Sequence, residues 1–81
     1  MGATQKRAAD IIALKKLMIE KGFKTIGALA DVSGIGRTTL GKVLDGKIQP
    51  STDTMFKLMD ALDIPNEEAG KIFFAVNLRS A

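Results

Sequence analysis

The sequence predicts an all-α domain in which five helices enclose one small core. Apolar side chains recur at helical spacing in five stretches, which are separated by glycines, prolines and other turn-forming residues. No run of alternating apolar and polar residues is long enough to predict a strand. The predicted helices span residues 4–21, 25–33, 36–44, 52–62 and 66–76.

Length and composition indicate a single folded domain over residues 1–81. The sequence has no Cys and no His, which removes thiol nucleophiles, imidazole bases and the commonest metal ligands. No apolar run approaches the ~20 residues that span a bilayer, and the polar first ten residues do not form a signal peptide. We therefore expect a cytoplasmic protein without catalytic residues, metal, cofactor or membrane partner.

The charges are unevenly distributed along the chain. The net charge is +3, but residues 1–50 carry +5 and residues 51–81 carry −2. A basic half beside a mildly acidic half argues against a protein that coats nucleic acid on all sides.

The first predicted helix, residues 4–21, has an apolar stripe that is expected to face the core. The stripe consists of Ile11, Leu14, Leu17 and Met18. Ile12 and Ile19 lie a heptad apart on a different ridge. We favour the interpretation that a C-terminal helix covers them, and the alternative is contact with a partner subunit.

Residues 25–47 are predicted to form two short helices joined by a tight turn. Thr25 can cap the first helix through its hydroxyl group, and Gly34 can adopt the positive φ that ends it. Ile35 then returns an apolar anchor to the core.

The second of these helices has two different sides. Leu40, Val43 and Leu44 form an apolar side, whereas the opposite side carries Arg37, Thr38, Gly41 and Lys42 and no carboxylate before Asp45. Two helices joined by a short glycine turn are typical of the unit that places a helix in the DNA major groove. An ordinary helical hairpin with a solvated basic face has the same spacing.

Two further helices complete the predicted core. Ser51 can cap the fourth helix, and Glu67 and Glu68 suit the positive end of the fifth. The core stripes of these helices are Met55, Leu58, Met59 and Leu62, and then Ala69, Ile72, Phe73 and Val76. Phe74 and Leu78 lie on another face. With Ile12 and Ile19 they are the best candidates for a dimer interface, and the alternative is that they cap the core of the monomer.

A longer pattern runs through most of the chain. It consists of Leu29-Ala30, Gly34-Ile35, Thr38-Thr39-Leu40, Leu44-Asp45-Gly46-Lys47, Pro50-Ser51, Thr54, Lys57-Leu58 and Ala61-Leu62. This pattern resembles the phage-repressor and Cro-type (XRE-like) helix-turn-helix family over about residues 14–64. The resemblance implies a compact five-helix lambda-repressor-like domain that binds double-stranded DNA as a dimer and regulates transcription, as a repressor.

The resemblance also implies roles for individual residues, with the second helix of the motif in the major groove. The expected base-reading set is Arg37, Thr38, Lys42, Gly41 and Gly36. The expected phosphate-binding set is Lys24, Thr25, Ile26, Thr39 and Lys47. Two positions depart from the family pattern. Ile26 stands where Gln is common, so only its backbone N–H suits a phosphate and its side chain is expected to pack inward. Gly36 replaces a polar residue and lets two backbones approach closely.

Two alternative functions are those of an antitoxin and of an enzyme. An antitoxin can use the same fold to bind a partner toxin and its own operator, although the predicted helices leave no extended segment to wrap such a partner. An enzyme would need a constellation of catalytic groups. Glu67-Glu68 and the pair Asp60 and Asp63 instead suit solvated helix ends, and the glycines form no phosphate-cradling motif. We therefore expect a DNA-binding regulator that is not an enzyme.

Overall fold

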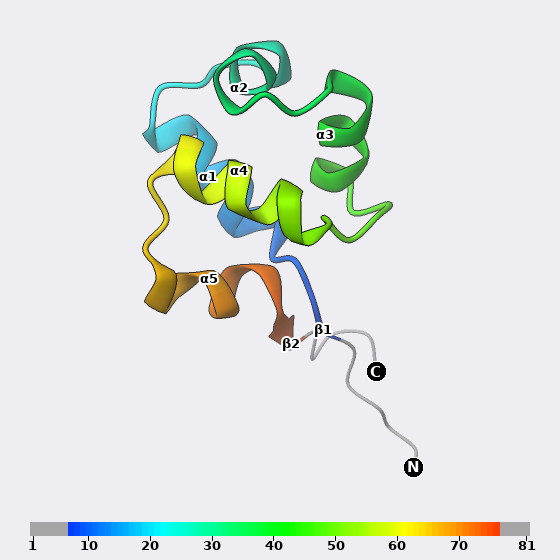
Figure 1. Cartoon of the computed structure of the whole chain (residues 1–81), viewed down its shortest axis with the longest axis vertical. Coiled ribbons are helices and arrows are strands. Elements are labelled where there is room, and N and C mark those ends of the chain that lie inside the picture. Colours follow the sequence, from blue (N-terminus) through cyan, green and yellow to red (C-terminus); the bar gives the residue numbers. More distant parts are fainter. Residues whose placement is uncertain (1–6, 77–81) are drawn as a thin grey trace.

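The computed structural model describes residues 7–76, which form five helices and one pair of very short strands (Figure 1). The helices are α1 (Ile11–Glu20), α2 (Ile26–Ser33), α3 (Arg37–Leu44), α4 (Thr52–Leu62) and α5 (Asn66–Phe73). The strands are β1 (Arg7–Ala8) and β2 (Ala75–Val76). The predicted all-α class is confirmed, whereas the strand pair was not predicted.

The first helix begins later than predicted, at Ile11 rather than at residue 4. The carboxylate of Asp10 accepts a hydrogen bond from the backbone N–H of Ala13 at 3.0 Å, which is the geometry of a helix N-cap. The backbone N–H of Asp10 also donates to the carbonyl of Ile72 at 2.6 Å. The preceding residues include good helix formers, but this cap and this tertiary bond determine where the helix starts. Residues 4–6 lie outside the described residues.

The last helix ends at Phe73, three residues before the predicted end. Phe74 leaves the helix with φ −129° and ψ 42°. The next two residues are extended and pair antiparallel with β1, so that Val76 lies opposite Arg7 and Ala75 opposite Ala8. Strands of two residues leave no alternating pattern in a sequence, which is why this pairing and the early end of α5 were missed.

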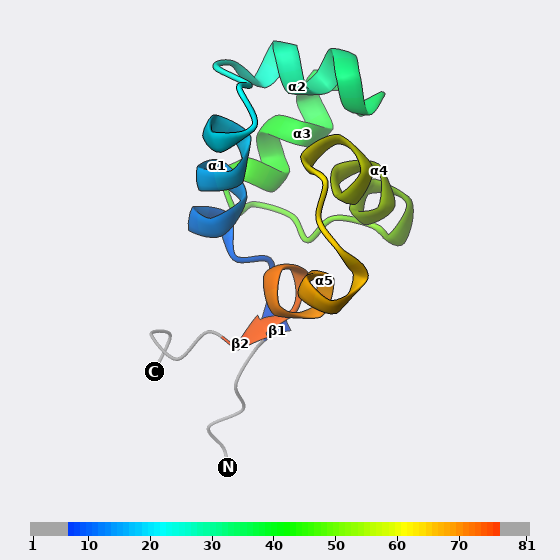
Figure 2. The same ribbon diagram turned by 90° about the vertical axis from the view of Figure 1, so that its left-hand side faces the viewer.

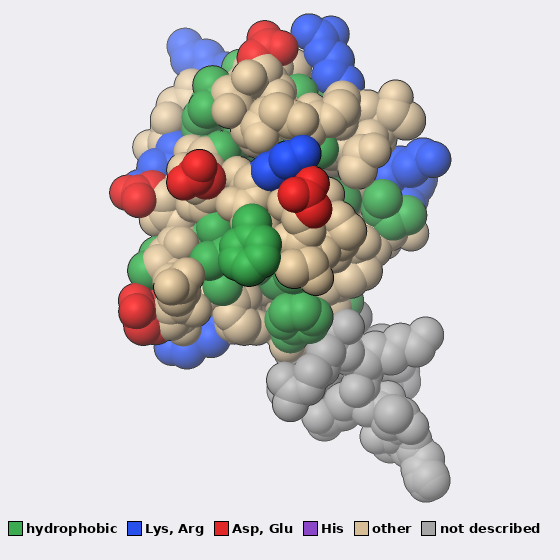
Figure 3. Space-filling model, in the orientation of Figure 1, with side chains coloured by type: hydrophobic (Ala, Val, Ile, Leu, Met, Phe, Trp, Pro, Cys, Tyr) green, Lys and Arg blue, Asp and Glu red, His purple; other side chains and the backbone are tan. Residues whose placement is uncertain are grey.

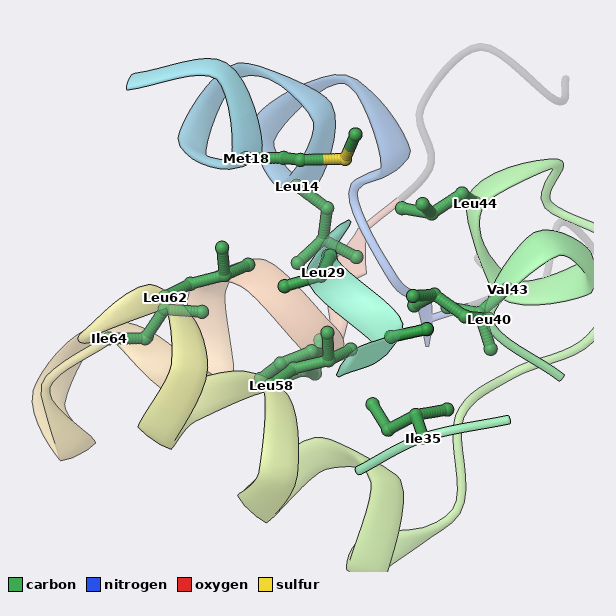
Figure 4. Packing of buried hydrophobic residues seen from close by; sticks show 12 residues of the cluster. Leu14, Met18, Leu29, Ile35, Leu40, Val43, Leu44, Leu58, Leu62 and Ile64 are labelled. Carbon is green, nitrogen blue, oxygen red and sulfur yellow. The ribbon is translucent and has the colours of Figure 1, made fainter. Parts of the chain in front are cut away.

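Each helix of the described chain contributes side chains to one hydrophobic core (Figure 4). The buried set is Leu14, Met18, Leu29, Ala30, Ile35, Leu40, Val43, Leu44, Leu58, Leu62, Ile64 and Phe73. Complete burial of a leucine side chain contributes roughly 1.5–3 kcal/mol, so these contacts dominate the stability of so small a domain. Met55 and Met59 of the predicted α4 stripe are only partly buried against this core.

The side chain of Gln49, in the loop between α3 and α4, contacts segments near both ends of the described chain. Its Oε1 accepts a hydrogen bond from the backbone N–H of Ala9 at 2.9 Å. Its Nε2 donates to the carbonyl of Phe73 at 2.7 Å. Both backbone groups lie just outside regular hydrogen-bonding patterns, where a side chain can satisfy them.

The helix pair α2–α3 and the strand pair occupy opposite ends of the described molecule (Figures 1 and 2). In both views α2 lies at the top beside α3, while β1 and β2 lie at the bottom beside α5. The strand pair therefore does not cover the surface formed by α2 and α3.

Candidate nucleic-acid interface

Short-range hydrogen bonds fix the geometry of the turn between α2 and α3. The hydroxyl oxygen of Thr25 accepts a hydrogen bond from the backbone N–H of Ala28 at 3.1 Å and so caps α2. Gly34 ends the helix at φ 77°, a conformation that favours glycine. Ser33 Oγ then accepts from the N–H of Ile35 at 3.2 Å, and the Ile35 side chain is buried in the core. The predicted cap, stop and anchor are thus confirmed.

The third helix separates its apolar and polar side chains cleanly. Leu40, Val43 and Leu44 are buried, as the spacing predicted. The exposed residues are Arg37, Thr38, Thr39 and Lys42, and Gly41 is half-buried. Gly36 is the extended N-cap residue of α3 rather than its first helical residue, and it is also exposed.

The expected phosphate-binding side chains are also exposed. Lys24 and Thr25 precede α2, and Lys47 follows α3. The position of Lys47 is set by a turn at Gly46 with φ 75° and by a hydrogen bond of 2.9 Å from its backbone N–H to the carbonyl of Lys42. This bond holds Lys47 beside the last turn of α3.

The prediction that the Ile26 side chain packs inward is wrong. Ile26 is the first residue of α2 and is 37% exposed. It is not part of the core cluster. The core side of α2 begins at Leu29 and Ala30 instead. Ile26 lies in the first turn, before this buried pair, and so at the rim of the packed face. Helical spacing alone therefore predicted more burial for Ile26 than the structure shows.

The cations of this surface are not engaged in ion pairs within the described residues. The ion pairs found there involve Lys21 with Asp63, Lys57 with Asp53, and Lys71 with Glu68. Lys24, Arg37, Lys42 and Lys47 therefore keep their charges available to an acidic partner.

Arg37 contacts the first turn of α2 through its guanidinium group. A Cβ atom added at Gly27 would lie 2.9 Å from Nη2 and 3.1 Å from Cζ of Arg37. The guanidinium group therefore rests directly over Gly27. Gly27 was not singled out in the sequence analysis. A glycine in the first turn of a helix is nevertheless a usable signal of close packing when no positive φ is needed there.

The helix-turn-helix family model matches residues 14–68, which include α2, the turn and α3. The chain belongs to the Cro/C1-type helix-turn-helix family. It is therefore a DNA-binding helix-turn-helix regulator, as the sequence pattern predicted. A comparison with curated proteins found no match.

In this helix-turn-helix protein, the residues expected at a dimer interface are exposed where the structure describes them. Ile12 and Ile19 on α1 are 69% and 68% exposed, so the favoured prediction that a C-terminal helix covers them is wrong. That helix ends at Phe73, and the chain then turns into β2. Phe74 is 45% exposed, and Leu78 lies outside the described residues.

Further apolar side chains are exposed beyond those that the sequence singled out. Phe56 on α4 is 63% exposed and Val32 on α2 is 64% exposed. In the view of Figure 3, hydrophobic side chains are exposed on the lower part of the face that α4 and α5 form. Phe56 falls outside the i, i+3, i+4 stripe of α4, which is why the core pattern does not include it.

Neither a metal-binding cluster nor a membrane-spanning helix is found among residues 7–76. No group of three or more acidic, His or Cys side chains there could hold a metal ion. No helix in this part of the chain combines the length and the apolar character that crossing a membrane requires.

Proposed function

We propose that this protein is a sequence-specific repressor that binds double-stranded DNA as a homodimer, with α3 in the major groove. The observation that carries the proposal is the division of α3 into two sides. Its apolar side is buried in the core, while its other side presents Arg37, Thr38 and Lys42 to solvent. Buried leucines fix the orientation of the helix, so the exposed side is a rigid surface for reading base edges.

The proposed base readers lie toward the N-terminal end and along the exposed side of α3. The guanidinium fork of Arg37 can donate two hydrogen bonds to O6 and N7 of a guanine. The methyl group of Thr38 can contact a thymine methyl, and Lys42 lies about one turn further along the same side. Gly36 and Gly41 add no side chain, which allows the helix backbone to approach the DNA closely.

The proposed phosphate contacts flank the reading helix. Thr25 uses its hydroxyl oxygen as the acceptor in the α2 cap, so its O–H remains free to donate to a phosphate oxygen. Lys24 and Lys47 supply charge, Thr39 supplies a second hydroxyl, and Ile26 supplies its backbone N–H at the start of α2. Contacts of this kind fix register without reading sequence.

The proposal includes a homodimer in which two copies of α3 reach two half-sites. Exposed Ile12, Ile19 and Phe74 support it, because large apolar side chains left exposed are typical of interfaces. Successive half-sites on one face of B-DNA lie about 34 Å apart, or one helical turn. In this proposal the protein acts in the cytoplasm, where its operator lies, and it acts by binding alone.

An unbiased selection from a pool of randomised duplexes tests the proposal. We expect enrichment of an inverted repeat whose half-sites are about 10 base pairs apart, and protection of that repeat in footprinting. A reporter placed behind the selected repeat should lose expression when the protein is produced. Recovery of no common sequence, with equal binding to every duplex, would overturn sequence-specific recognition.

A second candidate function is that of an antitoxin which also binds a partner toxin. Exposed apolar side chains on α1 and α4, Ile12, Ile19 and Phe56, favour a protein partner. The oligomeric state of the purified protein distinguishes the two functions. A homodimer at micromolar concentration favours the repressor, whereas a monomer that forms a defined complex with a small co-purified toxin favours the antitoxin.

A further inference from the structure

We propose that Gly27 is a positioning residue for base reading, because its missing side chain leaves a seat on α2 that holds the guanidinium group of Arg37. This inference rests on the proposed function, in which Arg37 reads a base. It adds a residue that lies on the other helix of the motif and that would not itself contact DNA.

The fit between the two residues is close. A Cβ atom at position 27 would lie 2.9 Å from Nη2, 3.1 Å from Cζ and 3.3 Å from Nε of Arg37. All three distances are shorter than an ordinary van der Waals contact of about 3.5–4.0 Å between carbon atoms. Any residue other than glycine would therefore force the guanidinium group to move.

No other described glycine has this relationship to a functional side chain. The others have open space at the corresponding point, apart from Gly46, where the nearest atom is a side-chain carbon of Ile11 at 3.7 Å. Gly22, Gly34 and Gly46 are explained by a positive φ, but Gly27 is not among the residues with that conformation. Space for Arg37 is thus the feature that distinguishes Gly27.

Stability does not explain the seat. A glycine in a helix is less favourable than an alanine, and a cation near a helix N-terminus faces the positive end of the helix dipole. Within the described residues no carboxylate pairs with Arg37. The arrangement is therefore unfavourable for the isolated domain and is best accounted for by what Arg37 does when bound.

The seat limits the directions that the Arg37 side chain can take. An arginine side chain has many rotamers, and part of this freedom is lost when a base contact forms. Support from the α2 backbone removes some of that freedom in advance, so less is lost on binding. It also fixes the angle of the fork, which matters because bidentate pairing with guanine depends on geometry.

The test uses Gly27→Ala, with Gly70→Ala in α5 as its matched control. Both changes add one methyl group to a helical glycine, but the Cβ at position 70 meets no atom within 4 Å. Binding is measured by fluorescence anisotropy on the selected operator, on an operator with the Arg37-read G·C pair replaced, and on random DNA. Thermal unfolding is measured in parallel.

We expect Gly27→Ala to unfold at or above the wild-type temperature, because the clash falls on the mobile end of a side chain. Its affinity for the operator should fall about fivefold, with a matching loss of discrimination at the G·C pair that Arg37 reads. A complete bidentate contact changes affinity by ~5- to 150-fold, and we expect only part of it to be lost. Binding to random DNA should stay within about twofold, and Gly70→Ala should bind as the wild type does. In an Arg37→Ala background, Gly27→Ala should cause no further loss, because the two residues act through one contact.

The outcomes distinguish the seat from the function. If Arg37→Ala loses operator affinity while Gly27→Ala does not, the seat is refuted and the proposed function stands. If Gly27→Ala weakens binding equally with and without Arg37, the seat is again refuted. If Arg37→Ala loses nothing on the operator, base reading by Arg37 fails and the inference fails with it.

Discussion

The Nε2 atom of Gln49 donates a hydrogen bond of 2.7 Å to the backbone carbonyl of Phe73, so the loop after α3 is joined to the end of α5. The same side chain accepts a hydrogen bond from the backbone N–H of Ala9 at 2.9 Å. One amide group therefore connects the segment that carries Lys47 to the place where both described ends of the chain meet. Nothing in the hydrophobic pattern indicates this role, because it depends on a contact between residues 24 and 40 positions apart.

Replacement of Gln49 with Ala should destabilise the domain by about 1–2 kcal/mol, because the backbone groups of Ala9 and Phe73 lose their hydrogen-bond partner. Water can take the place of Gln49 only in part. For a domain of this size that loss corresponds to a fall of roughly 4–16 °C in melting temperature. Gln49→Glu keeps an acceptor for Ala9 but sets a carboxylate oxygen against the carbonyl oxygen of Phe73, so we expect a loss at least as large as that of Gln49→Ala. Asn66→Ala, which removes an exposed amide at the start of α5, is the control and should change stability by less than about 0.5 kcal/mol. Equal melting temperatures for Gln49→Ala and the control would show that the connection does not stabilise the fold.

Thr25 has two proposed roles, as a helix cap and as a phosphate contact, and substitutions can separate them. Thr25→Ala removes both, and we expect a loss of about 1 kcal/mol in stability together with weaker DNA binding. Thr25→Asp keeps an acceptor for the N–H of Ala28, so thermal stability should be retained. Its negative charge should nevertheless repel phosphate and weaken binding to all duplexes. Wild-type affinity in Thr25→Asp would remove Thr25 from the phosphate set.

Much of the fold follows from the sequence because its signals are local. The cap at Thr25, the positive φ at Gly34 and the buried face of α3 each depend on residues within one or two helical turns, and each was predicted correctly. The errors in the bounds of α1 and α5 arise where contacts between distant residues decide the outcome. The start of α1 depends on the bond from Asp10 to Ile72, and the end of α5 depends on pairing with β1. The position of Gly27 under Arg37 has the same cause, since it requires the angle between two helices.

Lys47 should contribute charge without reading sequence. We expect Lys47→Ala to weaken binding to the operator and to random DNA by the same factor, and to reduce the slope of log affinity against log salt by about 0.9. Lys71→Ala, on α5, makes the same change in net charge away from the helix pair and should leave the slope unchanged. Titrations at several salt concentrations measure both. A slope that falls equally in the two variants would assign the effect to net charge rather than to a contact by Lys47.

The proposed dimer interface predicts an effect of charge on α1. Ile12→Asp and Ile19→Asp should dissociate the dimer at micromolar concentration and leave the monomer folded, because both side chains are exposed in the isolated domain. Val32→Asp, at an exposed apolar position on α2, is the matched control and should remain dimeric. Sedimentation velocity gives the oligomeric state, and circular dichroism confirms folding. A wild-type protein that is monomeric both free and on its operator would exclude this dimer.

Arg37 is the leading proposed base reader. It is exposed, lies at the first position of α3 and has no carboxylate partner among the described residues. Arg37→Ala should therefore change the free energy of unfolding by less than about 0.5 kcal/mol, as is usual for surface sites. It should cost about 1–3 kcal/mol in operator binding and relax the preference at one G·C pair of each half-site. Arg37→Lys restores the charge but not the planar fork, so affinity for random DNA should recover while the preference for G·C should not. Quantitative binding to the operator and to its single-pair variants measures both effects. Equal losses on the operator and on random DNA would make Arg37 a phosphate contact, and no loss on either would mean that α3 is not the recognition helix.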